Sequence, residues 1–139
     1  MNRQTSEPFG YLLVHFIESP HGYGEQIYMD LSCGDDPLCW RSLSHGEPIL
    51  TSDIGTTGVR DPYITKNPET GTYYIIATDL RVFDGTSTEI SDDSWREWSR
   101  HGSTNLVVWE SSDLVHWRGP HCLDVAVRPA GTRDQLGMA

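Results

Sequence analysis

The stretch GVRDPYITKNPETGTYYIIATDL, residues 58–80, decides the predicted fold. Residues 63–66 and 72–80 are rich in β-branched and aromatic side chains, which favour strands. The linker between them combines Asn67-Pro68 with Gly71, and such a combination is typical of a turn. The sequence therefore predicts an antiparallel β-hairpin here, with Asp61 and Pro62 at the mouth of its first strand.

Further strand signals lie on both sides of this hairpin. Residues 11–17 form an apolar and aromatic run that is long enough for a buried strand and too short for a helix. Residues 26–32 alternate between two faces, and residues 105–110 are rich in Val and Trp. Another strand is predicted from Trp117 towards Val127. The fold class is therefore all-β.

The order of these segments repeats along the chain. Each unit reads as strand, strand, Ser/Asp loop, Trp and strand, first from residue 11 and again from residue 73. A four-stranded unit that recurs at roughly 40 to 60 residues is typical of a β-propeller blade. About two blades cannot close a ring, so we predict a partial β-propeller of antiparallel four-stranded blades. Its open strand edges would favour self-association.

This repeat predicts the organisation of the chain. We expect a polar tail over 1–9, a partial blade over 10–56 and a second blade over 57–127. The second blade carries an insertion over 82–103. Ser91-Asp92-Asp93-Ser94 can cap a helix, so a short helix is predicted near 91–100. Residues 128–139 form an atypical C-terminal tail.

Composition limits the class of protein. The chain has 139 residues, which suits one domain, and a formal net charge of −10. Nucleic acids and anionic membranes attract clustered Lys and Arg, so we expect neither as a partner. No apolar run approaches membrane-spanning length, and the N-terminus lacks the apolar core of a signal peptide. We therefore expect a cytoplasmic chain.

Three cysteines, Cys33, Cys39 and Cys122, make an odd count that does not indicate a disulfide framework. Cys33 and Cys39 flank a short acidic loop near His45, but their spacing fits no common zinc pattern. We expect reduced thiols, no metal site and no cofactor.

Asp61 is the leading candidate for a catalytic residue. Pro62 disfavours the helical region for the residue before it, so Asp61 is expected to be extended. A fixed carboxylate in a β-rich chain with many Trp and Tyr residues suggests sugar chemistry, although glycoside hydrolysis usually needs two carboxylates. The pattern alone is equally compatible with an aspartate that caps a turn.

Four further residues are candidates for binding substrate. Arg60 would favour the ionised form of Asp61, although adjacent strand residues point to opposite faces. Asp79 ends a strand and either contacts substrate or caps the following loop. Trp95 and Trp98 lie three apart and would share one helix face. They form either a sugar-stacking platform or a packing contact of the insertion.

Structural roles are expected for several other residues. Asp113 lies in SSDLVHW, residues 111–117, where it is expected to accept hydrogen bonds from turn amides. His15 sits in an apolar run and is predicted to be a hydrogen-bonded core histidine, with a role facing the central channel as the alternative. The remaining tryptophans predicted for the blade core are Trp40, Trp109 and Trp117.

Three segments together resemble the N-terminal region of glycoside hydrolase family 43. They are GVRDPYI at 58–64, YYIIATDL at 73–80 and VVWESSDLVHW at 107–117. The resemblance extends from about Gly10 to Val127. It implies a five-bladed β-propeller and a carbohydrate substrate, as in α-L-arabinofuranosidases, β-xylosidases and arabinanases.

The resemblance also implies a mechanism. In that family the Asp of the first Asp-Pro strand is the general base of an inverting single displacement, and this position falls on Asp61. The second Asp and the general-acid Glu come from later blades, which this sequence does not contain. We therefore expect a glycoside hydrolase fragment for arabinose- or xylose-containing plant polysaccharides, whose relatives include secreted proteins. The alternatives are a non-catalytic glycan-binding or ring-completing piece and an inactive truncated gene product.

Overall fold

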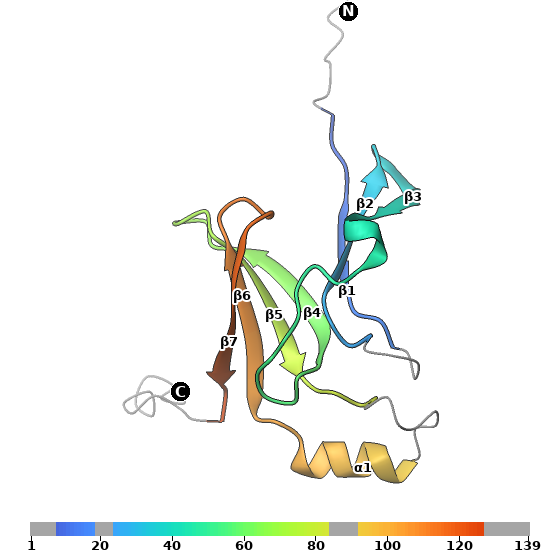
Figure 1. Ribbon diagram of the computed structural model, residues 1–139. Coiled ribbons are helices and arrows are strands. Elements are labelled where there is room, and N and C mark those ends of the chain that lie inside the picture. Colours follow the sequence, from blue (N-terminus) through green and yellow to red (C-terminus); the bar gives the residue numbers. More distant parts are fainter. Residues whose placement is uncertain (1–7, 19–23, 84–91, 127–139) are drawn as a thin grey trace, which may run out of the picture.

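The computed structural model describes residues 8–18, 24–83 and 92–126. These residues form two antiparallel sheets with the strand orders β1-β2-β3 and β4-β5-β6-β7 (Figure 1). The strands are β1 (Leu12–His15), β2 (Tyr28–Cys33), β3 (Asp36–Ser42), β4 (Val59–Lys66), β5 (Tyr73–Asp79), β6 (Asn105–Ser111) and β7 (Trp117–Asp124). A short 3-10 helix, η1 (Leu43–Gly46), follows β3, and α1 (Asp92–His101) lies between β5 and β6.

The all-β prediction is confirmed, and two open sheets are consistent with part of a propeller. The first sheet has three strands in the described residues, and the second has four. An isolated bridge joins Ile27 to Leu50 beside the first sheet. The loop predicted between Cys33 and Cys39 belongs in part to β3, which spans Asp36–Ser42. The predicted tails lie outside the described residues, apart from Pro8 and Phe9.

The β4–β5 hairpin forms as predicted because its turn satisfies its own polar groups. The backbone N–H of Asn67 donates to the carbonyl of Thr72, and that of Gly71 donates to the carbonyl of Asn67. The side chain of Asn67 accepts a hydrogen bond from the N–H of Glu69 at 2.9 Å. Gly71 has a φ of 73°, a left-handed conformation that glycine adopts without a steric cost.

The apolar core lies between the two sheets. Strands β5 and β6 alternate between buried and half-buried side chains, as expected when one face of a sheet is covered. Ile75 pairs with Trp109 in these strands, and Ala77 pairs with Val107. The buried cluster comprises Ile27, Met29, Leu50, Val59, Ile75, Ala77, Val107 and Trp109.

The three predicted core tryptophans have different environments. Trp109 is 2% exposed, and Trp117 packs against the same cluster, as predicted. The prediction for Trp40 is wrong, because its side chain is 39% exposed and its indole N–H donates to the carbonyl of Pro37. Trp40 lies on β3, the outer strand of the first sheet, where the second sheet does not cover it.

The two sheets meet through their inner edge strands, because β1 lies beside β4 (Figure 1). The predicted short helix is also present as α1. Within the described residues, no helix has the length and apolar character needed to cross a membrane.

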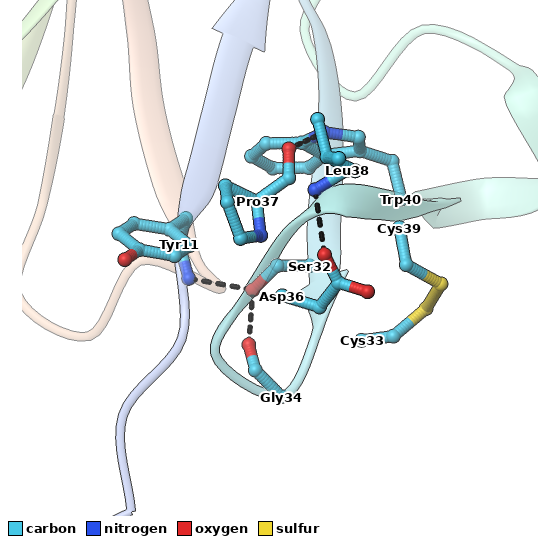
Figure 2. Close-up of a disulfide and its surroundings, with 9 residues drawn as sticks. All are labelled: Tyr11, Ser32, Cys33, Gly34, Asp36, Pro37, Leu38, Cys39 and Trp40. Atoms are coloured by element: carbon cyan, nitrogen blue, oxygen red, sulfur yellow. Dashed lines mark hydrogen bonds between the residues drawn. A yellow bond between two sulfur atoms is a disulfide. The ribbon is translucent and has the colours of Figure 1, made fainter.

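Cys33 and Cys39 form a disulfide across the β2–β3 turn, so the prediction of reduced thiols is wrong for both (Figure 2). Their Cα atoms are 5.3 Å apart, a separation that a disulfide can span. The β2–β3 hairpin brings them together, and β3 was not among the predicted strands. Cys122 on β7 is a free, exposed thiol.

Candidate active site

Asp61 lies in a β-bulge near the start of β4. Arg60 pairs with Thr78 and Tyr63 pairs with Ile76, so that Asp61 and Pro62 together face the single residue Ala77. A bulge of this kind redirects a side chain out of the regular strand alternation, and bulges are common beside active sites. The Asp61 side chain is accordingly exposed to solvent.

The backbone of Asp61 is not extended, which corrects the sequence prediction. Its φ is 50°, in the left-handed region. Pro62 disfavours the right-handed helical region, but the two-against-one pairing of the bulge requires a sharper bend than an extended residue gives. Left-handed backbone costs an L-residue about 1–2 kcal/mol, and Asp and Asn adopt it more readily than other residues. Strain of this kind persists where the surrounding structure imposes it, and it is concentrated at functional sites.

The side chain of Arg60 lies in the junction between the two sheets. Its side chain is 6% exposed, and its Nη2 lies 3.0 Å from the Oε2 of Glu18. Its Nε lies 3.7 Å from the Oε1 of Glu25, and its guanidinium lies 4.9 Å from the centre of the Phe16 ring. These partners all come from this chain, and a contact between Arg60 and substrate stays a prediction.

Glu25 and Gln26 are both buried beside this site, and the sequence did not predict a role in the site for either of them. The side-chain amide of Gln26 donates to the carbonyl of Thr57 at 3.0 Å, and its oxygen accepts from the N–H of Ser52 at 2.8 Å. The only signal in the sequence is a polar pair directly before an apolar strand. That signal does not distinguish a buried pair from a solvated one.

Asp79 is 3% exposed and joins two loops at the end of β5. Its carboxylate accepts hydrogen bonds from the N–H and the Oγ1 of Thr56, both at 2.8 Å, and from the Oγ of Ser103 at 2.6 Å. Gly55 passes so close to this carboxylate that a Cβ there would collide with it. The geometry fits the loop-capping alternative, and a contact of Asp79 with substrate stays a prediction.

The two tryptophans of the insertion lie on α1. Trp98 is half-buried, whereas the side chain of Trp95 lies outside the described part of the structure. The stacking platform therefore stays a prediction.

The predicted structural turn at Asp113 is confirmed. Its Oδ1 accepts hydrogen bonds from the N–H groups of Val115 at 2.9 Å and His116 at 2.8 Å, and its Oδ2 lies 2.7 Å from the His116 Nδ1. The His116 side chain and the two backbone N–H groups hold the pKa of Asp113 well below its usual range.

His15 is half-buried and hydrogen-bonded, with its Nε2 3.1 Å from the Oδ2 of Asp30. Among the described residues, no three His, Cys, Asp or Glu side chains are grouped closely enough to hold a metal ion.

Comparison with known proteins identifies the family. A family model described as a probable glycosyl hydrolase domain, related to family 43, matches residues 7–138. The chain belongs to this glycosyl hydrolase family. The resemblance seen in the sequence is therefore confirmed.

A curated relative supports the same assignment. The chain is 32% identical over 108 residues to an α-L-arabinofuranosidase from Bifidobacterium longum subsp. longum. The alignment covers 78% of this chain and 9% of that protein, so the chain spans a small part of its relative. No solved structure matches the chain.

Proposed function

We propose that this chain carries the general base of an inverting glycoside hydrolase and that Asp61 is this base. The substrate would be an arabinofuranoside or xyloside of a plant polysaccharide. The observation that carries the proposal is the bulge that turns the Asp61 carboxylate out of the sheet on the inner strand β4. Membership of a glycosyl hydrolase family and the arabinofuranosidase relative support the substrate class.

In the proposed reaction Asp61 accepts a proton from a water molecule. The water oxygen forms a bond to the anomeric carbon while the glycosidic bond breaks on the opposite face of the sugar. A carboxylic acid protonates the leaving oxygen, and in inverting enzymes it stands about 6.5–9.5 Å from the base. The family resemblance implies that this acid comes from a part of the propeller that this sequence does not contain.

The test uses a substrate that does not need the acid. Dinitrophenolate is a stable leaving group, so a dinitrophenyl α-L-arabinofuranoside or β-xyloside can react without protonation of the leaving oxygen. We expect slow release of dinitrophenolate by the chain and a loss of about 10²–10⁴-fold in Asp61→Ala, the usual contribution of a positioned base. Azide, which attacks without a base, should restore release in Asp61→Ala and form the glycosyl azide of inverted configuration.

Asp53→Asn is the matched control, because Asp53 is an exposed carboxylate in the loop before β4. Equal rates in Asp61→Ala and Asp53→Asn would refute the role of Asp61. A glycosyl azide of retained configuration would refute single displacement.

A non-catalytic role is the second candidate, and the two open sheets favour it. In this role the chain binds a glycan or associates with a partner, including a second copy, that completes the ring. Binding of arabino-oligosaccharides without turnover would favour this role over catalysis. Concentration-dependent assembly in sedimentation velocity would identify self-association.

A further inference from the structure

Glu25 has an unusually complete set of contacts for a carboxylate inside a small domain. The residue is 2% exposed. Its Oε1 and Oε2 accept hydrogen bonds from the N–H of Val82 at 2.9 and 3.0 Å, and Oε2 also accepts from the N–H of Phe83 at 3.0 Å. The Nε of Arg60 lies 3.7 Å from Oε1. One side chain therefore joins three segments: its own, the start of β4 and the segment that follows β5.

Burial makes these contacts costly to disturb. A buried carboxylate or guanidinium is tolerated only when charge and hydrogen bonds compensate for lost hydration. Arg60 and Glu25 compensate for each other by opposite charge, at 3.7 Å, and Glu18 and Phe16 hold the outer side of the guanidinium. Removing the charge of Glu25 would weaken the compensation on the inner side of Arg60, so that its guanidinium would turn towards Glu18 and Phe16 on the outer side. Such a turn would pull on the backbone of β4 directly beside Asp61.

Backbone hydrogen bonds also hold the start of β4, just before the bulge. The N–H of Val59 donates to the carbonyl of Glu25 at 2.9 Å, and the N–H of Leu80 donates to the carbonyl of Gly58 at 3.1 Å. A Cβ at Gly58 would lie 2.6 Å from the Cβ of Arg81, so the segments at 58 and 81 run in direct contact. The strand enters the bulge from an anchored point, and Glu25 is the side chain that links the segments around it.

We propose that Glu25 is a positioning residue: through Arg60 and the 82–83 backbone it fixes the bulge that presents Asp61. Its catalytic consequence rests on the proposed function, whereas its effect on the bulge does not. Glu25 neither faces the substrate nor transfers a proton. It determines where the strained Asp61 backbone, and hence the carboxylate, is held.

The test compares Glu25→Gln with Glu110→Gln in the full chain. Gln keeps the shape of Glu and removes its charge. Glu110 is the matched control, since it is paired with Arg118 at 2.9 Å on β6 and β7. It lies in register with Tyr74 and Thr65, at the other end of β5 and β4 from the bulge. Backbone chemical shifts and amide hydrogen exchange are measured for both variants below their melting temperatures.

We expect Glu25→Gln to shift the resonances of residues 58–63 and 80–83 and to speed their amide exchange about tenfold or more relative to β6. Glu110→Gln should leave them unchanged. Uniform acceleration of exchange across β5 and β6 would mean a general loss of stability and would overturn the proposal, as would unchanged resonances at 58–63. The double variant Glu25→Gln/Arg60→Gln should restore part of the stability lost in Glu25→Gln, because no buried charge remains uncompensated.

Turnover gives the second readout. With the dinitrophenyl arabinofuranoside, Glu25→Gln should lower kcat about 10- to 100-fold with KM within about twofold, as expected when a catalytic group is displaced by an ångström or less. A change in KM alone would contradict a positioning role. Altered resonances at 58–63 together with no turnover in any variant would refute the proposed function and leave the effect of Glu25 on the bulge established.

Discussion

The disulfide between Cys33 and Cys39 gives a quantitative prediction about stability. The perturbation is the double variant Cys33→Ser/Cys39→Ser, which cannot form the link. The bond joins residues separated by six positions in the sequence. Closing such a short loop removes entropy from the unfolded chain worth about 2 kcal/mol at 25 °C. We therefore expect the free energy of unfolding to fall by about 2 kcal/mol.

The folded state should lose few other interactions when the disulfide is removed. Cys33 is exposed, so its replacement by Ser removes little buried apolar surface. The turn also has its own hydrogen bond, from the N–H of Leu38 to the Asp36 Oδ1 at 2.9 Å (Figure 2). The end of β2 is held separately, because the N–H of Tyr11 donates to the Ser32 Oγ at 2.7 Å. The first sheet should therefore keep its fold in the variant, and only the unfolded state should change substantially.

The assay is urea unfolding of the wild-type chain, with and without a reductant, beside the double variant. The reduced wild type and the variant should share one midpoint below that of the oxidised chain. Cys122→Ser, which changes only the free thiol, is the control and should unfold like the wild type. Equal stability of the oxidised and reduced chains, or labelling of all three cysteines in the native protein, would refute the reasoning.

Two further predictions concern the second sheet. Trp109→Ala should lower the free energy of unfolding by about 3–5 kcal/mol, measured by urea unfolding, because it removes the largest fully buried side chain of the core; a loss below about 1 kcal/mol would contradict the core described here. The contacts of the 111–117 turn lower the pKa of Asp113 in the folded state. The ionised carboxylate therefore stabilises the turn at any pH above about 3.9, the ordinary pKa in the unfolded chain. This stabilisation is lost as the pH falls through the lower pKa of the folded state. An NMR titration should place the midpoint of Asp113 well below about 3.9. Asp113→Asn should abolish the dependence of the unfolding free energy on acid pH that comes from this group. A midpoint at the ordinary value would show that His116 does not hold the carboxylate.

The parts of the fold that sequence predicted are those set by local chemistry. The β4–β5 hairpin depends on Asn67 and Gly71, which satisfy their own turn, and the buried faces of β5 and β6 follow from simple alternation. The strand β3 was missed because Asp36 and Pro37 read as a loop. Pro37 is compatible with a strand here only because β3 is an edge strand, and that position depends on tertiary structure.

In the candidate site, too, the local sequence predicts some features and others depend on tertiary structure. The position of Asp61 follows from a short motif, but its left-handed backbone depends on the pairing of β4 with β5. The buried Glu25 and Arg60 are far apart in the sequence and meet only when the two sheets pack. No local pattern can predict that Glu25 accepts hydrogen bonds from the N–H groups of Val82 and Phe83.

The redox state of the chain bears on where it works. Disulfides persist mainly in oxidising compartments, and the reducing cytoplasm keeps most thiols free. The link between Cys33 and Cys39 is of the kind that an oxidising compartment preserves, and the cytoplasmic location expected from the polar N-terminus stays a prediction. Thiol labelling of the native protein tests directly whether Cys33 and Cys39 are oxidised.

The outer strands restrict how a partner could complete the ring. Both β3 and β7 carry a proline, Pro37 and Pro120, and proline has no N–H with which to continue a strand ladder. Proline on an edge strand discourages the addition of another strand. The proposed self-association through open edges is therefore hindered at these two strands. The sheet faces offer more to a partner, since Tyr63 on β4 is 68% exposed and Leu13 on β1 is 42% exposed. Blades that pack face to face around an axis would use these surfaces and leave the outer edges in solvent.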